Sequence, residues 1–206
     1  MPRLLETPYG PARLTAHGRA GHGTVLLMHG AGSSTDVPFL RGLAGELAAR
    51  GWRAVRLDQP YIVAGRRTPP PVPALDAVVD LVVARVRPQV LVGRSSGARA
   101  ACRAAARHPV TRVVAQGFPL HPPGRDVSRA DELAACPCPV LVVQGERDTF
   151  GGPREIASLG LAHVQVHAVA GADHTLRARR ADGRTEAECV GEAVGVAAAW
   201  LGHGAP

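Results

Sequence analysis

The sequence contains no lysine, so its 24 basic residues are all arginines, and the formal net charge is +7. A basic protein invites comparison with nucleic-acid-binding proteins, because a basic face attracts phosphates. The arginines are scattered, however, and they cluster only at 65–67 and 176–184. Alongside 24 glycines and 18 prolines, this composition is more typical of a codon bias than of a selected basic patch. We therefore do not expect a nucleic-acid partner.

Aromatic residues are also scarce, at 3% of the chain, whereas hydrophobic residues make up 46% and charged residues 20%. The two larger shares are ordinary for a globular protein and differ from those of disordered or fibrous chains. We therefore expect a core of valine, leucine and alanine. At 206 residues the chain is long enough to bury one full core, which predicts a single domain over residues 1–206.

No hydrophobic run approaches the roughly 20 residues that a membrane-spanning helix requires, and the opening MPRLLETPYG lacks the apolar stretch of a signal peptide. The sequence therefore predicts a cytoplasmic protein with no membrane partner. Only four cysteines are present, and in the cytoplasm they would stay reduced. Two of them form the turn Cys136-Pro137-Cys138, which no second ligand pair follows at metal-binding spacing. We expect neither a metal ion nor another cofactor.

Short apolar runs alternate with longer helical patterns, which is typical of a mostly parallel sheet covered by helices on both faces. The expected strands are 24–30, 52–58, 89–93, 110–120, 139–148 and 164–171, with a weaker antiparallel strand at 12–17. The expected helices are 37–50, 75–85, 96–107 and 185–201. The carboxyl ends of parallel strands meet at one edge of a sheet, where ligands bind. The sequences HGAG, DQP, GRSSG, FPLH and GERD all fall at such ends.

The sequence Gly93-Arg94-Ser95-Ser96-Gly97 lies between an expected strand and an expected helix. In this context G-x-S-x-G is the nucleophile elbow, a turn so tight that the serine takes a positive φ and side chains two positions away on either side would collide. Ser95 is therefore the candidate nucleophile. The backbone N–H of Ser96, at the start of a helix, is a candidate donor to the oxyanion that forms when a carbonyl is attacked.

A serine hydroxyl is a poor nucleophile without a base, and the base needs an acid to orient it. In this architecture the order is serine, then Asp or Glu, then His, each at the end of a later strand. Asp148 in GERD and His174 in GADH occur in that order. Glu146 is the rival acid, and we expect Asp173 to cap a loop. The alternatives are that Asp148 caps a turn and that His174 is an ordinary loop histidine.

The second oxyanion donor is expected in the loop after the first strong strand, which reads HGAGSS over 29–34. Small residues let the chain approach a substrate closely, so the backbone N–H of Ala31, or that of Gly32, is the candidate. We expect His29 to brace this loop through hydrogen bonds. A dinucleotide or phosphate loop is excluded, because the segment has neither a G-x-G-x-x-G after a strand nor the lysine of a Walker loop.

The sequences HGAG, GRSSG, GERD and GADH, in this order, resemble those of the α/β-hydrolase superfamily, and the resemblance covers essentially the whole chain. More narrowly, the chain resembles the dienelactone-hydrolase-related family that contains testis-expressed protein 30 and a subunit of the nonspecific-lethal histone acetyltransferase complex, at residues 29–32, 93–101 and 118–123. That family favours an arginine before the serine, the position of Arg94 here. The resemblance implies a compact α/β fold of eight strands, trimmed at its amino end, with a catalytic triad of Ser95, Asp148 and His174.

The sequence departs from lipases and many esterases of this superfamily in one respect. Those enzymes insert a cap between the fourth and fifth strong strands, whereas here only residues 119–138 separate them. We therefore expect no cap domain, and a shallow, open site for small acyl esters, thioesters or exposed peptide ends. Dienelactone hydrolases are of similar size but use a cysteine nucleophile, so Ser95 argues against that activity.

Other residues near the expected site are candidates for substrate binding. Gly32 and Arg94 lie in the motifs already described. His121 in FPLH would bind substrate or compete as the base, although a structural histidine in a proline-rich turn is the stronger interpretation. Arg66 and Arg67 would meet an anionic substrate, unless they simply lie in a solvated loop.

Two functions of different classes are compatible with these patterns. The first is a serine hydrolase that transfers the acyl group of a small-molecule substrate to water. The second is a catalytically silent α/β-hydrolase-fold protein that binds partners or acts as a scaffold, because the resembling family includes members of chromatin assemblies. A silent protein would tolerate loss of the triad, and all three residues are present, so we favour the enzyme.

Overall fold

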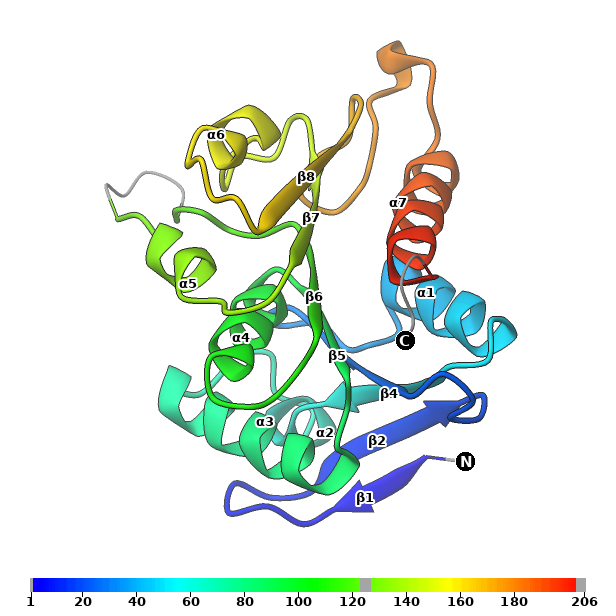
Figure 1. Ribbon diagram of the computed structural model, residues 1–206, viewed down its shortest axis with the longest axis vertical. Coiled ribbons are helices and arrows are strands. Elements are labelled where there is room, and N and C mark those ends of the chain that lie inside the picture. The colour runs from blue at the N-terminus through cyan, green and yellow to red at the C-terminus, as the bar shows by residue number, and fades with distance from the viewer. Residues whose placement is uncertain (1, 123–126, 203–206) are drawn as a thin grey trace.

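Eight strands form one sheet in the computed structural model, which describes residues 2–122 and 127–202 (Figure 1). Their order across the sheet is β1-β2-β4-β3-β5-β6-β7-β8. Strand β2 pairs antiparallel with β1 and β4, and the other neighbouring strands are parallel. The strands are β1 Arg3–Leu5, β2 Ala12–His17, β3 Thr24–Met28, β4 Arg53–Asp58, β5 Val90–Arg94, β6 Arg112–Gln116, β7 Val140–Gly145 and β8 Val164–Val169.

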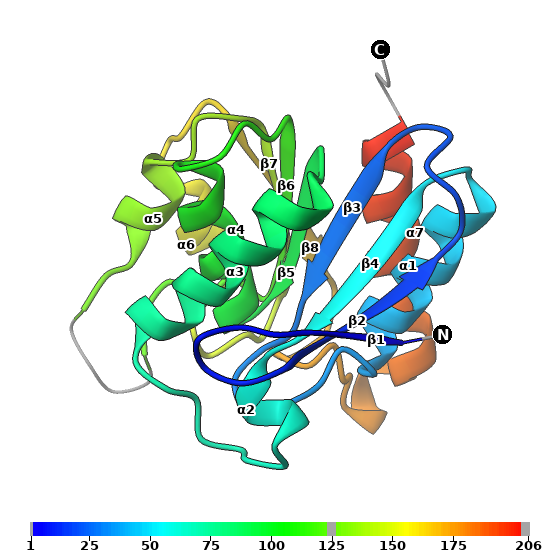
Figure 2. The same cartoon turned by 90° about the horizontal axis from the view of Figure 1, so that it is seen from below.

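Helices cover both faces of the sheet (Figure 1 and Figure 2). One face carries α1 Pro38–Ala49 and α7 Glu186–Gly202, which pack against each other. The other face carries α3 Val72–Val86, α4 Ser96–Ala105, α5 Ala130–Ala134 and α6 Pro153–Ala157. The single-turn helix α2 Pro60–Val63 follows β4, and the 3-10 helix η1 Arg180–Asp182 precedes α7. The expected parallel sheet between two helical layers is confirmed.

Two apolar layers form the core, one on each face of the sheet. Side chains alternate along a strand, so in β3 Val25 and Leu27 face α1 and α7, while Leu26 and Met28 face the opposite layer. All five residues of β3 are buried, which explains why this strand reads as a continuous hydrophobic run. Valine, leucine and alanine dominate the core, as expected, with Phe118 as its largest fully buried side chain.

The observed elements differ from the expected ones at strand ends and in the short helices α2, α5, α6 and η1, which were not among the expected helices. Strand β6 ends at Gln116 because the next residue, Gly117, has a φ of 59° and leaves the extended conformation. Strand β7 likewise ends at Gly145. The amino end of the sheet is fuller than the resemblance implied, since β1 is present and pairs with β2. Three residues are too few to produce a recognisable strand pattern.

The described residues of the connection from β6 to β7 place no further domain over the carboxyl ends of the strands. These residues contain only the five-residue helix α5, and no cap domain, as expected. Residue 123, which belongs to the resemblance in FPLHPP, lies outside the described residues. In the part of the chain that the structure describes, no helix combines the length and the apolar character needed to cross a membrane.

Candidate active site

Ser95 lies in a sharp turn between β5 and α4, with a φ of 53° and a ψ of −119°. Its backbone N–H donates a hydrogen bond to the carbonyl oxygen of Gln116 at 2.9 Å. A Cβ atom on Gly93 would collide with the backbone of Gly97, and a Cβ on Gly97 would lie 2.5 Å from the carbonyl oxygen of His29. Glycine at both positions therefore lets β3, β5 and α4 meet closely enough to form the elbow.

Three side chains from separate loops form a continuous hydrogen-bonded chain. Nε2 of His174 lies 2.9 Å from Oγ of Ser95, and Nδ1 of His174 lies 2.7 Å from Oδ2 of Asp148. Asp148 follows β7 and His174 follows β8, so both come from the same edge of the sheet as Ser95. With the ring proton on Nδ1 and donated to Asp148, Nε2 is free to accept the serine proton. The geometry is that of a serine with its general base and orienting acid.

The carboxylate of Asp148 is fully buried, with 0% of its side chain exposed. Nε2 of Gln144 donates to Oδ2 at 2.8 Å, and the backbone N–H of Phe150 donates to Oδ1 at 2.9 Å. Such donors are needed because an unpaired charge in the interior is strongly destabilising. The same Gln144 amide donates to the carbonyl of Gly151 at 2.7 Å. Gln144 thus fixes the orientation of the acid relative to the loop before α6.

The imidazole of His174 is enclosed by residues from two other loops. The ring of Phe150 packs against it with centroids 4.5 Å apart. A Cβ on Gly117 would lie 3.2 Å from Nδ1 and Cε1 of the ring, and the positive φ of Gly117 also favours glycine. Nε2 of Gln116 donates to the backbone carbonyl of His174 at 3.3 Å. These contacts hold the ring between Ser95 and Asp148.

Asp173 shapes the loop that carries His174. Its Oδ1 accepts hydrogen bonds from the backbone N–H groups of Thr175 at 2.8 Å and Arg177 at 3.0 Å. Burial would raise the pKa of Asp173, but these hydrogen bonds outweigh it and leave the pKa below its usual value. The residue caps the loop, as expected.

Glu146, the alternative acid, and His121, the alternative base, contact residues outside the triad. Glu146 is exposed, and its carboxylate accepts a hydrogen bond from the N–H of Gly171 at 3.0 Å. His121 is half-buried, with its Nε2 3.0 Å from a carboxylate oxygen of Glu155 on α6. Asp148, not Glu146, is therefore the acid joined to His174, and His121 is engaged by α6 rather than by Ser95.

His29 braces the loop after β3, as expected. The backbone N–H of Gln59 donates to its Nε2 at 3.1 Å, so Nδ1 carries the ring proton and donates to the carbonyl of Gly30 at 2.8 Å. Burial lowers the pKa of His29, against the smaller opposing effect of the Gly30 carbonyl. The neutral ring that this hydrogen-bond pattern requires is therefore the favoured form.

The backbone N–H groups of Ala31 and Ser96 have no acceptor among the described residues. Ala31 is exposed, and Ser96 is the first residue of α4, where the helix dipole adds positive potential. The backbone of Gly32 lies near the hydroxyl of Tyr61, where it opposes the rise in the pKa of Tyr61 that burial causes. The geometry leaves the N–H groups of Ala31 and Ser96 available to an oxyanion.

Asp58 at the end of β4 holds the far part of the same loop. Its Oδ1 accepts from the backbone N–H of Thr35 at 2.7 Å and from the Thr35 hydroxyl at 2.9 Å. Asp58, Gln59 and Gln144 had no role assigned from the sequence. In the sequence, the only indication of a role was that each is a polar residue near the end of a buried strand. That position does not reveal which residue it contacts in the folded protein.

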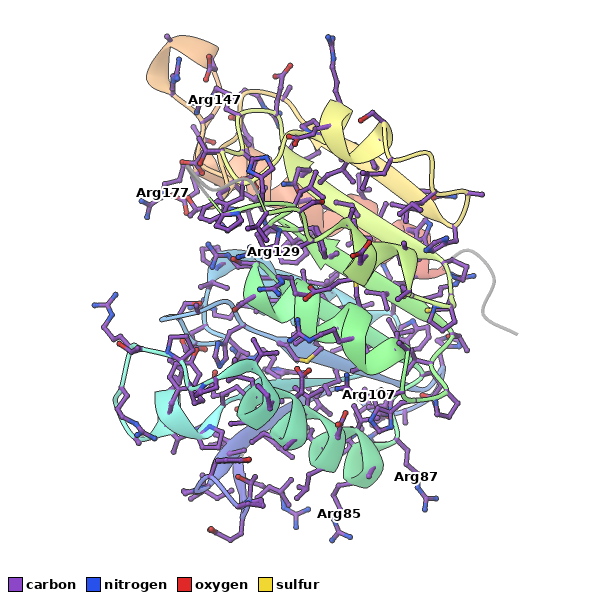
Figure 3. All side chains as sticks on the ribbon, turned by 90° about the vertical axis from the view of Figure 1, so that its left-hand side faces the viewer. Arg85, Arg87, Arg107, Arg129, Arg147 and Arg177 are labelled. Atoms are coloured by element: carbon purple, nitrogen blue, oxygen red, sulfur yellow. The ribbon has the colours of Figure 1, made fainter. Side chains whose placement is uncertain are left out.

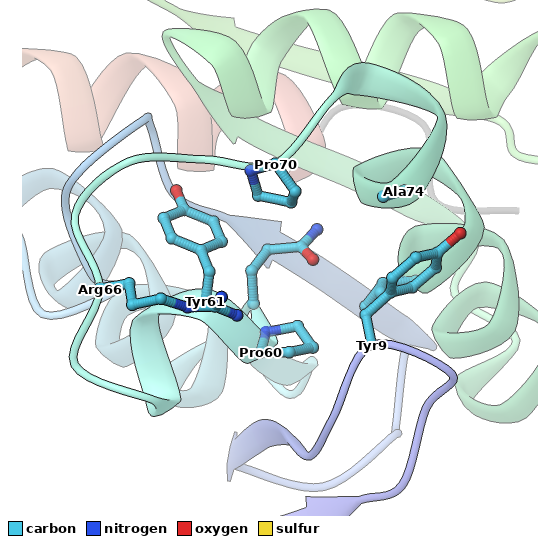
Figure 4. Close-up of a pocket in the computed structure, with 8 residues that line it drawn as sticks. Tyr9, Pro60, Tyr61, Arg66, Pro70 and Ala74 are labelled. Atoms are coloured by element: carbon cyan, nitrogen blue, oxygen red, sulfur yellow. The ribbon is translucent and has the colours of Figure 1, made fainter.

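The arginines expected near substrate lie in different surroundings. Arg94 is half-buried, whereas Arg66 and Arg67 are exposed. The carbonyl oxygen of Arg67 lies 3.2 Å from the point that a Cβ on Gly32 would occupy. The loop that carries Arg67 therefore touches residues 29–34, the loop after β3 that we call the oxyanion loop. Beside it is a cavity of about 180 Å³ (Figure 4), lined by Tyr9, Gln59, Pro60, Tyr61, Arg66, Pro70, Ala74 and Val78.

Other charged and metal-binding groups give no second candidate site. Figure 3 shows Arg147 and Arg177 at the opposite end of the view from Arg85 and Arg87, in keeping with scattered arginines. Within the described residues, no three His, Cys, Asp or Glu side chains are grouped so that they would hold a metal ion. The four cysteines are buried free thiols.

Solved structures share this fold. The esterase domain of a Rhodothermus marinus protein is 19% identical, with a TM-score of 0.70, over 97% of this chain and 96% of that one. A serine hydrolase without a lid from Xanthomonas campestris is 19% identical, with a TM-score of 0.65, over 97% and 94% of the two chains. Dienelactone hydrolase from Anabaena variabilis is 18% identical, with a TM-score of 0.65, over 98% of each chain.

The sequence itself gives a family match. No curated protein matches the chain. The model of the alpha/beta hydrolase domain family, however, matches residues 21–202. This range includes the elbow, the loops that carry His29 and His174, and every strand of the parallel part of the sheet. The chain therefore belongs to the alpha/beta hydrolase family.

Proposed function

We propose that the protein is a serine hydrolase that cleaves a small ester, thioester or amide through an acyl-enzyme intermediate. The observation that supports this most directly is the hydrogen-bonded chain from Ser95 through His174 to Asp148, with distances of 2.9 Å and 2.7 Å. Hydrogen-bond distances of this size between nucleophile, base and acid are what proton transfer requires.

Each residue then has a defined task. His174 takes the hydroxyl proton as Ser95 attacks the carbonyl carbon, and Asp148 stabilises the imidazolium that results. The N–H groups of Ala31 and Ser96 bind the oxyanion. His174 returns the proton to the leaving alcohol, thiol or amine. It next deprotonates a water molecule, which releases the acyl group as a carboxylic acid and restores Ser95.

The open edge of the sheet supports a small substrate. Within its described residues, the β6–β7 connection provides only α5, so no large lid encloses a long acyl chain. We propose a small-molecule acyl substrate and a cytoplasmic enzyme that needs neither nucleic acid nor membrane.

We also propose that the chain belongs to the narrower family of testis-expressed protein 30. The resemblance rests on HGAG, GRSSGARAA and FPLHPP. The alternative to the enzyme is a catalytically silent scaffold. A scaffold has no need for a base held within hydrogen-bond distance of both Ser95 and Asp148. A hydrolase is the simpler explanation of this arrangement.

Labelling with a fluorophosphonate probe tests the proposal. We expect one adduct on Ser95, located by mass spectrometry, and its loss in Ser95→Ala and His174→Ala. Asp148→Asn should lower the rate of p-nitrophenyl acetate hydrolysis by about 10⁴-fold, because the imidazole would then adopt the wrong tautomer.

Ser96→Ala is the matched control for this experiment. It removes the neighbouring hydroxyl but keeps the backbone N–H and Ser95, so labelling should persist. A folded protein that neither reacts with the probe nor hydrolyses p-nitrophenyl acetate would contradict the enzyme and support the scaffold.

A further inference from the structure

The guanidinium of Arg94 lies beside the nucleophile and the oxyanion loop. Its Nη1 atom and Cβ of Ser95 both lie 3.1 Å from the point that a Cβ on Gly30 would occupy. Along β5, Gly93 faces α4, so the alternation of a strand directs Arg94 to the other face of the sheet. Arg94 therefore lies next to the reacting atoms rather than at the rim of the molecule.

Among the described residues, no hydrogen bond or salt bridge is formed by this guanidinium, although it is half-buried. Several other arginines that are partly or largely buried are paired. Arg56 donates to the carbonyl of Thr35 at 2.8 Å and to Asp36 at 2.7 Å. Arg99 and Arg103 each make two hydrogen bonds with one carboxylate, at 2.6–2.8 Å. Arg94 thus keeps five N–H donors unused at the edge where a substrate would bind.

The charge of the Arg94 guanidinium is destabilised by its surroundings. Burial lowers the pKa of Arg94, and the charge of Arg177 acts in the same direction, while Asp148 and Asp173 oppose them from beyond salt-bridge distance. A charge that leaves water without a hydrogen-bonded partner loses solvation, which a close anion would replace. Asp148 cannot serve as that anion, because it is bound to His174 and Gln144.

We propose that Arg94 is an anion-binding residue of the active site, and that the preferred substrates are acyl compounds with a carboxylate a few carbon atoms from the scissile carbonyl. A guanidinium binds a carboxylate through two parallel N–H donors, which gives both strength and orientation. This inference rests on the proposed hydrolase and names its substrate class.

The reaction that follows is balanced hydrolysis of a dicarboxylic monoester. The Oγ of Ser95 forms a bond to the acyl carbon, the bond from that carbon to the alcohol oxygen breaks, and the proton passes through His174 to the alcohol. Water then cleaves the acyl-enzyme and yields a dicarboxylate. Arg94 holds the distal carboxylate in both steps and takes no proton.

Kinetics with two matched substrates test the proposal. Mono-4-nitrophenyl glutarate carries the carboxylate, and 4-nitrophenyl methyl glutarate replaces it with a neutral ester. We expect Arg94→Gln to lower the ratio of kcat/KM for the anionic over the neutral substrate at least about 10-fold, because the site loses the guanidinium that lies beside the nucleophile. Arg94→Lys should keep part of that ratio. Arg85→Gln, which removes one exposed charge at the far end of the molecule, should keep all of it.

The outcomes separate this inference from the proposed function. A ratio unchanged in Arg94→Gln, or an equal loss for both substrates, would overturn anion recognition while the hydrolase stands. If the native protein hydrolyses neither ester and the fluorophosphonate leaves no adduct, the proposed function fails. Titration with glutarate by calorimetry then decides the anion site. Binding that Arg94→Gln abolishes supports the site, and equal or absent binding in both proteins overturns it.

Discussion

Ser95 is held in a backbone conformation that residues other than glycine rarely adopt, with φ at 53° and ψ at −119°. Such a conformation costs on the order of 1–3 kcal/mol. The hydrogen bond from its N–H to Gln116 and the close packing at Gly93 and Gly97 hold it there. The strain has a functional result, because it presents Oγ to His174 instead of burying it against α4.

Replacing Ser95 with glycine should therefore abolish activity and relieve the backbone strain. Both Ser95→Gly and Ser95→Ala lose the nucleophile, but only glycine also removes the strain. We expect Ser95→Gly to be more stable than Ser95→Ala by about 1 kcal/mol, after the backbone entropy of glycine is taken into account. Urea unfolding at pH 7.5 measures the difference.

The neighbouring serine provides the control. Ser96 lies in the first turn of α4, where glycine is destabilising by roughly 0.5–1 kcal/mol relative to alanine. The order of stability at position 96 should thus be reversed. The same order at both positions would show that Ser95 is not strained.

Three arginines spaced four residues apart, two on helix α4 and Arg107 just after it, tie this part of the chain to its neighbours. Their carboxylate partners come from α3 and α5: Arg99 pairs with Glu132, Arg103 with Asp76 and Glu132, and Arg107 with Asp76 and Asp80. These pairs connect the helix that begins at the elbow to the layer that covers it. Much of the basic charge of α4 is therefore balanced within the fold.

Arg103 lies at the centre of this network, with 17% of its side chain exposed. Arg103→Met keeps the apolar stem but removes the ion pairs with two half-buried carboxylates. We expect a loss of about 1–2 kcal/mol in the free energy of unfolding, less than for a fully buried pair, because Arg99 and Arg107 still face those carboxylates. Thermal or urea unfolding measures it.

Arg50→Met tests whether burial is the reason for the loss of stability expected in Arg103→Met. Arg50 pairs with Glu46 within α1, and both side chains are about 40% exposed or more. An exposed pair at this spacing contributes only about 0.3–0.5 kcal/mol. Equal losses in the two variants would contradict a special role for the α3–α4–α5 network.

The stability of the whole molecule should depend on pH through two histidines. Burial lowers the pKa of His29, and burial together with the charge of Arg56 lowers that of His17, both from 6.5. A lowered pKa means that the unfolded chain binds protons more readily than the folded one. This contribution is present above pH 6.5 and is lost as the pH falls through the lowered values.

We therefore expect the free energy of unfolding to decrease between pH 7.5 and 5.5, and to decrease less in His29→Gln. Asp58 and Arg94 also act on the pKa of His29, the first raising it and the second lowering it, but burial has the largest effect. Urea unfolding at the two pH values measures the change.

His22→Gln is the matched control, since His22 is exposed. It should show the same loss of stability between pH 7.5 and 5.5 as the native protein. A His29→Gln variant that also keeps this loss would contradict the role of His29.

Much of this protein follows from local sequence. The elbow motif predicts glycine at 93 and 97 from the turn alone, and the collision that Gly93 avoids does lie within that turn, with the backbone of Gly97. The alternation of apolar runs predicts the parallel sheet, since strands buried on both faces read as continuous hydrophobic segments. The order of Ser95, Asp148 and His174 follows from that sheet, because each residue comes at the end of a strand.

Other features depend on contacts between distant segments, which only the tertiary structure decided. Asp148 and Glu146 are two residues apart in one turn, and the turn directs only Asp148 towards His174. Gln144 reads as one more strand residue until its amide reaches Asp148. Arg94 reads as one arginine among 24 until its neighbours leave it without a counter-ion. The sequence determined which groups lie at the catalytic edge, and folding decided their partners, because hydrogen bonds form between atoms that are near in space and not in the chain.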